Sequence, residues 1–190
     1  MKKFNIIYAD PPWHYRCGGN RSARRHYSLM SIDEICALPV QNLAADDCVL
    51  FLWVTFPILS EVFDVIKAWG FTYKTVAFTW AKTNKNKDGY FIGLGHWTRA
   101  NAEICLLATK GKPKRVAKNV PQLIVEPRRE HSRKPDVTRE RIVSLCGDLP
   151  RVELFARQAF PGWDAWGNEV DCTVELTSGQ VVPKCEEENL

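Results

Sequence analysis

A strand pattern near the N-terminus stops abruptly at an acid followed by two prolines. Residues 4–9 (FNIIYA) are mostly apolar, and Asp10, Pro11, Pro12 and Trp13 follow at once. Because proline donates no hydrogen bond to a sheet and fixes its own φ, two in succession end the strand in a rigid, extended turn. The sequence therefore predicts that Asp10 lies at the carboxyl end of a buried strand, where open α/β sheets bind their ligands.

Strand-like and helix-like segments alternate along the rest of the chain. Further strands are predicted at 48–54, 73–81, 102–109, 121–125 and 151–156, and helices at 31–38, 57–69 and from 136 or 138 to 146. Ser31 and Glu34 have the spacing of a helix capping box, and Gly70 and Gly147 stand where helices should end. This alternation predicts an α/β domain of three layers with a mostly parallel sheet.

The composition limits the class of protein. A chain of 190 residues with 45% hydrophobic content can form one domain with a substantial core. No apolar run reaches the length of a membrane span, and no signal-peptide pattern follows the first residues. The seven cysteines are never closer than twelve positions, which excludes CxxC pairs and favours reduced core thiols in the cytoplasm. No histidine or cysteine has the spacing of a metal ligand, so no metal is expected.

Positive charge gathers in the predicted loops. Residues 171–190 carry a net charge of −4, so residues 1–170 carry +8 although the whole chain carries only +4. The basic clusters lie at 16–25, 82–87, 110–118 and 128–133. Such clusters favour a partner with a phosphate backbone, whereas ordinary solvated surface is the alternative for any single one.

The turn at Asp10 has the groups that a nucleobase amine would need. The lone pair of such an amine is delocalised into the ring, so a site that makes it react must accept hydrogen bonds from both of its N–H groups. Asp10 offers a carboxylate, Pro11 offers a rigidly held carbonyl, and Trp13 offers a flat ring for stacking. The alternative is a strand-ending turn closed by an aromatic plug.

At this motif the sequence resembles the adenine-N6 methyltransferases related to the catalytic subunit that methylates messenger RNA. The resemblance continues in the same order through Cys48–Thr55, Trp80–Lys82, Gly95–Leu107, His131–Asp136, Glu153–Arg157 and Pro161–Glu169. Together these blocks are far more specific than any one of them. The resemblance implies a Rossmann-like methyltransferase domain over residues 1–170 that uses S-adenosylmethionine, followed by an acidic C-terminal extension at 171–190.

The resemblance also implies which residues react and bind. The catalytic turn would be Asp10, Pro11, Pro12 and Trp13. The implied donor-binding residues are Asp10, Lys134, Glu153, Phe155, Arg157, Asn168 and Glu169, with Lys134 at the methionine carboxylate and the last three near the ribose. Tyr27 matches a tyrosine of the family on the loop after the turn and is a candidate substrate-binding residue, as is Trp13. Arg24, Arg25 and Lys82 are further candidates because they belong to basic clusters, and a structural role is the alternative for Lys82. Glu103 is an acid among apolar residues and must be paired if it is buried, either structurally or with substrate.

We therefore expect methyl transfer from S-adenosylmethionine to the N6 amine of adenine, in DNA more than in RNA, on a base extruded from its stack. The same reaction on RNA stays open because the family acts on both. Methylation of the N4 amine of cytosine is disfavoured, since those enzymes usually have Tyr or Phe at the position of Trp13. A non-catalytic nucleic-acid-binding partner subunit is a further alternative, although such members typically lose the acid or the second proline.

Target recognition has no separate domain in this sequence. The loops at 14–29, 83–99 and 110–133 would therefore have to read the nucleic acid. A homodimer or a partner protein could supply further surface, and the sequence does not choose between them.

Overall fold

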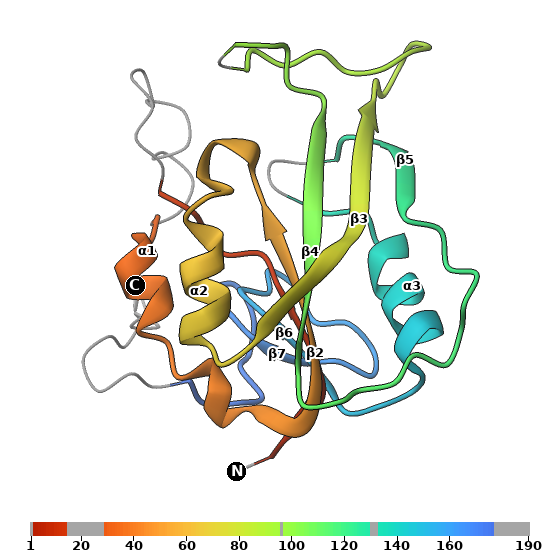
Figure 1. Ribbon diagram of the computed structural model, residues 1–190. Coiled ribbons are helices and arrows are strands. Elements are labelled where there is room, and N and C mark those ends of the chain that lie inside the picture. The colour runs from red at the N-terminus through yellow and green to blue at the C-terminus, as the bar shows by residue number, and fades with distance from the viewer. Residues whose placement is uncertain (1, 15–28, 96, 130–132, 177–190) are drawn as a thin grey trace, which may run out of the picture.

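A seven-stranded mixed sheet with the strand order β5-β3-β4-β2-β1-β6-β7 forms the centre of the computed structural model (Figure 1), which describes residues 2–14, 29–95, 97–129 and 133–176. The strands are β1 (Phe4–Ala9), β2 (Ala44–Val54), β3 (Thr72–Thr83), β4 (Ala102–Lys110), β5 (Leu123–Pro127), β6 (Arg151–Leu154) and β7 (Asp164–Trp166). The helices are α1 (Ile32–Cys36), α2 (Val62–Ala68) and α3 (Val137–Cys146), with short 3-10 turns at Val40–Asn42 and Phe56–Ile58.

All strands except β4 point the same way. β1 pairs in parallel with β2 and β6, β6 pairs in parallel with β7, and β3 pairs in parallel with β5. β4 runs antiparallel between β2 and β3. The mostly parallel α/β architecture is thus confirmed, and the reversed β4 is an addition to it. One edge of the sheet, called here the carboxyl edge, holds the ends of the six parallel strands and the start of β4.

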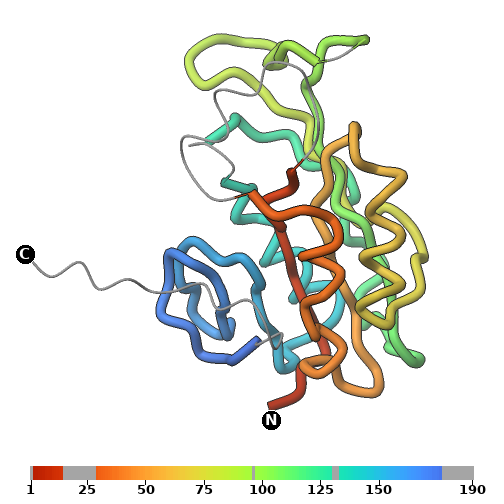
Figure 2. Tube along the Cα trace, turned by 90° about the vertical axis from the view of Figure 1, so that its left-hand side faces the viewer, coloured from red at the N-terminus to blue at the C-terminus, as the bar shows by residue number. Residues whose placement is uncertain are grey.

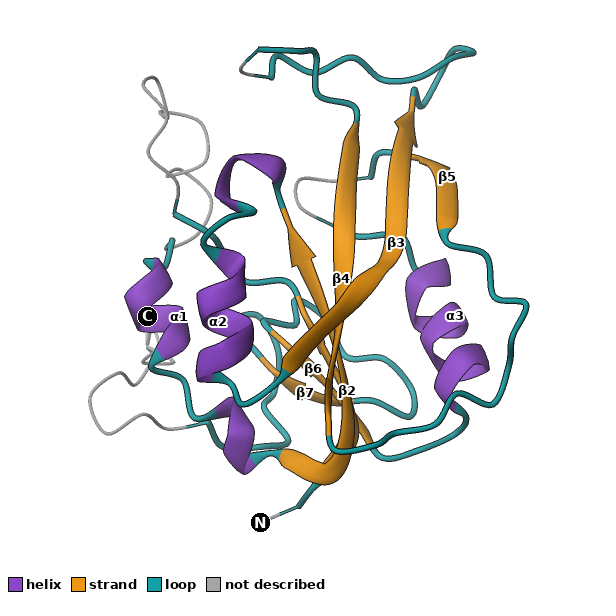
Figure 3. Ribbon diagram, in the orientation of Figure 1, coloured by secondary structure: helices purple, strands orange, loops and turns teal. Residues whose placement is uncertain are grey.

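Helices cover both faces of the sheet (Figures 1 and 3). Ile35 of α1 and Val65 of α2 belong to one core, whereas Ile142 of α3 belongs to a second core on the other face. Along β1, Ile7 joins the first core and Tyr8 the second. A strand buried on both faces must be apolar throughout, which explains the continuous apolar run before Asp10.

Most helices and strands begin and end within a few residues of the bounds predicted from local sequence. The Ser31 hydroxyl accepts a hydrogen bond from the Glu34 N–H at 3.2 Å, and the Glu34 carboxylate accepts one from the Ser31 N–H at 2.7 Å, so the capping box is present. The helix predicted at 57–69 is shorter, because its first turn forms the separate 3-10 turn Phe56–Ile58. β7 was not predicted, since three residues are too few to show a pattern.

Residues beyond β7 pack back onto the domain. The Thr173 N–H donates to the Ala165 carbonyl at 2.9 Å, and Val174 and Leu176 are buried in the first core. In Figure 2 the blue chain that follows β6 lies gathered on one side of β1. The described part of the predicted C-terminal extension therefore contributes to the core.

None of the helices in the described part of the chain is both long and apolar enough to cross a membrane. The cysteines of the described residues, Cys36, Cys48, Cys105, Cys146 and Cys172, are all free thiols.

Candidate active site at the carboxyl edge

Backbone hydrogen bonds hold the Asp-Pro-Pro-Trp turn in place. The Trp13 N–H donates to the Pro11 carbonyl, the Met30 N–H donates to the Pro12 carbonyl, and the His14 N–H donates to the Met30 carbonyl, each at 2.9 Å. The turn is therefore rigid, as two successive prolines predicted. The Pro11 carbonyl keeps one further lone pair for another donor.

Trp13 closes the turn from the inside. Its side chain is only 6% exposed and belongs to the first core, and its indole N–H donates to the Trp53 carbonyl at 3.0 Å. The Trp53 indole in turn donates to the Tyr8 hydroxyl at 2.7 Å. This placement corresponds to the aromatic plug considered for the motif, and stacking of a base on Trp13 stays a prediction.

Four charged side chains from separate parts of the sequence form a continuous chain of ion pairs at the carboxyl edge. The Lys134 ammonium lies 2.6 Å from Asp10 and 3.3 Å from Glu103, and Glu103 lies 2.5 Å from Lys82. These residues come from the end of β1, the loop before α3, the start of β4 and the end of β3. The structure thus joins three predicted site residues and gives Glu103 the partners that its burial requires.

Burial and ion pairing together shift the pKa values of Asp10, Glu103 and Lys134 in different directions. Burial raises the pKa of Asp10, and Lys134 offsets only part of that shift. Burial alone would raise the pKa of Glu103 as well, but Lys134 and Lys82 together lower it below its ordinary value. Burial works against the charge of Lys134, yet Asp10 and Glu103 outweigh it and raise its pKa. Lys134 and Glu103 thus stay charged, and Asp10 is the easiest member to protonate.

Phe155 stands beside Asp10 at the end of the neighbouring strand. The parallel register pairs Ala9 with Leu154, so the residues that follow them lie at the same level. Phe155 has φ of +60°, the only positive value at a non-glycine position in the described residues. Its ring packs edge-on against Trp166 with centroids 5.3 Å apart. Strained backbone of this kind is concentrated at functional sites.

The segments 153–157 and 166–169 meet at this edge. The Ala156 N–H donates to the Trp166 carbonyl at 2.9 Å, and a Cβ on Gly167 would lie 2.1 Å from the Ala156 carbonyl oxygen, so only glycine allows the approach. Arg157 donates to the Glu169 carboxylate at 2.8 Å, and both side chains are about half exposed. With Asn168 also exposed, the predicted ribose-binding residues form one accessible group.

Glu153, another predicted donor-binding residue, is buried, unlike Arg157, Asn168 and Glu169. Arg139 of α3 donates to both of its carboxylate oxygens, at 2.7 and 2.6 Å, and the guanidinium stacks 3.6 Å from the Phe160 ring centroid. Burial raises the pKa of Glu153, and Arg139 offsets part of that effect. Arg139 was not predicted as a site residue. A buried acid in a strand requires a cation, and α3 directly precedes β6 in the sequence, so its arginines were the available signal.

The basic clusters separate in space. The clusters at 82–87 and 128–133 follow β3 and β5 and lie at the carboxyl edge. The cluster at 110–118 follows the reversed β4, so it begins at the opposite edge (Figure 1). Of the described part of the loop 110–133, only the residues that follow β5 therefore lie at the same edge as Asp10. Arg24, Arg25 and Tyr27, predicted to contact substrate, lie outside the described residues.

Comparison with known proteins accounts for this arrangement. The chain is 37% identical to the type II methyltransferase M.MunI of a Mycoplasma species, over 95% of this chain and 84% of that protein. It is 34% identical to the N(6)-adenosine-methyltransferase MT-A70-like protein of Drosophila melanogaster and 31% identical to the N(6)-adenosine-methyltransferase catalytic subunit METTL3 of Homo sapiens. Each of these two matches covers 90% of this chain, which spans only 28% and 29% of those longer proteins. The MT-A70 family model matches residues 4–169, which include the whole ion-pair chain and both strand ends beside it, so this chain belongs to the MT-A70 family.

Proposed function

We propose that this protein uses S-adenosylmethionine to methylate the N6 amine of adenine at specific sites in DNA. The observation that carries the proposal is the position of Asp10, which ends β1 in a rigid turn, lies level with Phe155 and pairs with Lys134 at 2.6 Å. Membership of the MT-A70 family supports the type of reaction. Helices on both faces of a mostly parallel sheet support a three-layer, Rossmann-like form of the fold.

The carboxyl ends of β1 and β6 are where the methyl donor would bind. The chain leaves β1 toward α1 on one face, whereas Trp163, which follows β6, packs with the core of the other face. Ligands of α/β sheets bind where the connections from neighbouring strands diverge in this way. Phe155 would line this site. Glu153, two residues earlier in β6, would help to fix the strand end through its hydrogen bond with Arg139.

The side chains at these strand ends match the charges of the donor. S-adenosylmethionine has a carboxylate, an ammonium group and a ribose with two neighbouring hydroxyls. Lys134 would bind the carboxylate and Asp10 the ammonium, while Asn168 and Glu169 would hold the hydroxyls, with Glu169 oriented by Arg157 at 2.8 Å. When bound, the donor supplies a methyl group on a positively charged sulfur.

Asp10 and the Pro11 carbonyl would bind the target amine. Two fixed acceptors orient both N–H groups, and orientation is the main contribution required when the donor is already activated. Because the amine nitrogen becomes positively charged as it is methylated, the Asp10 carboxylate stabilises that charge. The surplus proton of the nitrogen can then pass to Asp10 or to water. Lys82 would support Asp10 indirectly, through Glu103 and Lys134.

DNA is the proposed substrate because M.MunI, matched over 84% of its own length, is a type II methyltransferase, a class of DNA-modifying enzymes. RNA is the second candidate, because the Drosophila and human relatives are named N(6)-adenosine-methyltransferases. We further assign residues 1–170 to the catalytic domain and 171–190 to an acidic extension. The protein would act in the cytoplasm, alone, as a homodimer or with a partner protein.

Isotope-labelled S-adenosylmethionine, offered with an equal mixture of unmethylated DNA and unmodified RNA, tests the proposal. The nucleosides are then separated and identified by mass spectrometry. Labelled N6-methyldeoxyadenosine is the expected product, and labelled N6-methyladenosine would move the substrate to RNA. Methylated cytidine would overturn the assignment. The Asp10→Ala variant should give no label in either nucleic acid.

A further inference from the structure

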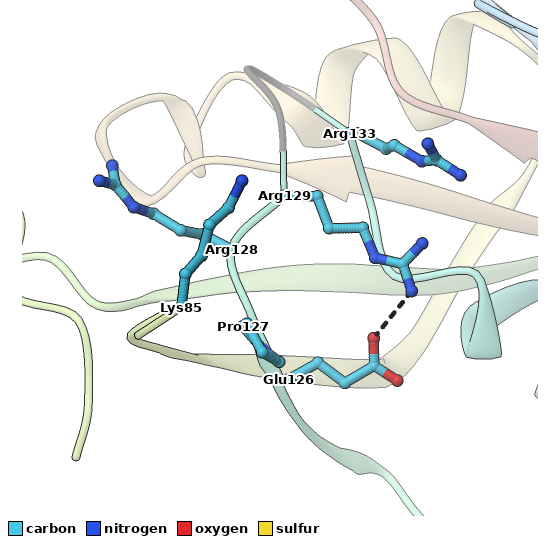
Figure 4. A pocket seen from close by; sticks show the side chains of 6 residues that line it. All are labelled: Lys85, Glu126, Pro127, Arg128, Arg129 and Arg133. Atoms are coloured by element: carbon cyan, nitrogen blue, oxygen red, sulfur yellow. Dashed lines mark ion pairs between the residues drawn. The ribbon is translucent and has the colours of Figure 1, made fainter. Parts of the chain in front are cut away.

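A basic hollow of about 510 Å³ opens at the carboxyl edge, beside the ends of β3 and β5 (Figure 4). It is lined by Lys85, Glu126, Pro127, Arg128, Arg129 and Arg133. Four of these side chains are cationic and only one is acidic. Lys85 and Arg128 are exposed and both line the hollow, whereas Arg129 turns toward Glu126 (Figure 4). The hollow therefore has an excess of positive charge close to the proposed active site.

The cations of the hollow differ in what neutralises them. Arg129 pairs with Asp136 and lies 3.7 Å from Glu126, and Arg133 pairs with Asp136 at 3.2 Å. Within the described residues, no acid lies at ion-pair distance from Lys85 or Arg128. The Arg133 Nε–H is buried without an acceptor there. Cations that line one hollow without a paired acid are attracted to an anion placed there, so the hollow fits an anionic ligand better than water alone.

Arg128 is held in position before any ligand binds. Its backbone N–H donates to the Thr83 carbonyl at 3.3 Å, which continues the pairing of β3 with β5. Its guanidinium lies 4.2 Å from the centre of the Phe91 ring, and the Phe91 N–H donates to the Lys82 carbonyl at 2.8 Å. A guanidinium stacked on a ring keeps its N–H edge available, and that edge matches the oxygens of a phosphate.

We propose that Lys85 and Arg128 bind a backbone phosphate of the nucleic acid, beside the nucleotide whose adenine enters the active site. The inference rests on the proposed function. Lys85 follows Lys82 by three positions, and Lys82 is joined through Glu103 and Lys134 to Asp10. A phosphate held here would fix the strand next to the reacting base. The ligand is a phosphodiester, and it is recognised without reading a base.

The salt dependence of DNA binding tests this site. A fluorescently labelled DNA duplex of mixed sequence is titrated with the full chain at several salt concentrations, with anisotropy as the readout. Arg128→Gln and Lys85→Gln should each weaken binding, and together they should lower the slope of log affinity against log salt by about 1, the contribution of one phosphate. Phe91→Leu keeps every charge and should weaken binding less than Arg128→Gln.

Lys114→Gln is the matched control, because Lys114 is also an exposed cation but lies in the loop that starts at the opposite edge. It should leave the slope at the wild-type value. The proposal fails if the Arg128 and Lys85 variants keep the wild-type slope, or if Lys114→Gln lowers it equally. Titration with inorganic phosphate alone separates the two sources of phosphate. In this titration the heat of phosphate binding is measured by calorimetry for wild type and for Arg128→Gln. If the variant loses this heat but binds the duplex as wild type does, free phosphate is the ligand, and the assignment to nucleic acid is overturned.

Methyl transfer and donor binding, measured on the same proteins, separate this inference from the proposed function. If the slope depends on Arg128 and Lys85 but wild type transfers no methyl group, the phosphate site stands and the proposed reaction fails. If wild type methylates DNA and the slope ignores both residues, only the phosphate site fails. Donor affinity should be equal in all variants of the hollow.

Discussion

Asp10 lies in surroundings that act on its pKa in opposite directions. Its side chain is 27% exposed, and burial raises the pKa, while the Lys134 ammonium at 2.6 Å lowers it. A carboxylate with little competing water is a stronger hydrogen-bond acceptor than the same group in solution. Such an acceptor is what a weakly basic nucleobase amine requires. The reactivity of the proposed site therefore depends on the surroundings of this one carboxylate.

Asp10→Asn keeps the size of the side chain and removes its charge. We expect methyl transfer to slow by about 10²- to 10³-fold, the range found when one group that stabilises transition-state charge is removed. Single-turnover transfer of a labelled methyl group measures the effect. Asp164→Asn is the control, since Asp164 also pairs with a lysine, Lys2, at 2.6 Å but on the edge strand β7. Equal rates for the two variants would contradict the role of Asp10.

Lys134→Met should change how transfer depends on pH. Transfer needs ionised Asp10, so the rate falls as the pH drops through the pKa of that carboxyl. Burial raises this pKa and Lys134 lowers it, so removal of Lys134 raises it further and moves the falling limb to higher pH. The pH profile of kcat at saturating donor shows the shift. Lys82→Met should give a smaller shift, because the Lys82 charge lowers the pKa of Asp10 less than Lys134 does. If the acidic limb of the kcat profile lies at the same pH in Lys134→Met as in wild type, Lys134 does not lower the pKa of the catalytic carboxyl.

The proposed ribose-binding residues follow two short strands, β6 and β7. The segments after these strands are held together by one close contact. β6 has four residues and β7 has three, so few ladder hydrogen bonds fix them. The contact of Gly167 with the Ala156 carbonyl brings Arg157 and Glu169 together. The proposed site thus depends on the close approach of these two elements, which only a glycine at position 167 allows.

Gly167→Ala should disturb this connection. The new Cβ would lie 2.1 Å from the Ala156 carbonyl oxygen, a backbone atom that cannot rotate away. We expect a loss of about 1–3 kcal/mol in the free energy of unfolding, as for other overpacked sites, together with weaker donor binding. Urea denaturation and donor titration measure the two effects. Gly89→Ala, strained at φ +92° but with nothing within 4 Å of its Cβ, should lose stability without losing donor affinity.

The start of the extension 171–190 belongs to the packed core of the whole molecule, because Val174 and Leu176 are 9% and 3% exposed and lie in the first core. Removal of residues 171–190 should therefore lower the free energy of unfolding by about 3 kcal/mol or more, from the burial of two aliphatic side chains. Removal of only 177–190 keeps both side chains, so the difference in stability between the two shortened chains measures their contribution. Urea denaturation of the two shortened chains and the full chain is the measurement. Equal stability of the two shortened chains would show that this burial contributes nothing.

Much of the fold was predictable because local sequence encodes it. The apolar run before Asp10, the capping box at Ser31 and the glycine after α3 each depend on a few neighbouring residues, and each prediction is confirmed. The direction of β4 was not predictable from such signals. A strand pairs in parallel or antiparallel according to where its partner lies, and the partners of β4 are distant in the sequence or separated from it by the long connection 84–101.

Local sequence was enough to identify the reactive residue types and their places along the chain: the acid and prolines after β1, the lysine before α3, and the arginine after β6. Only the tertiary structure decided which of them meet. It placed Lys134 between Asp10 and Glu103, turned Trp13 into the core, buried Glu153 against Arg139, and brought Lys85 and Arg128 to one hollow. The physical reason is that local preferences act over a few residues along the chain, whereas ion pairing and burial depend on groups that folding brings together from distant segments.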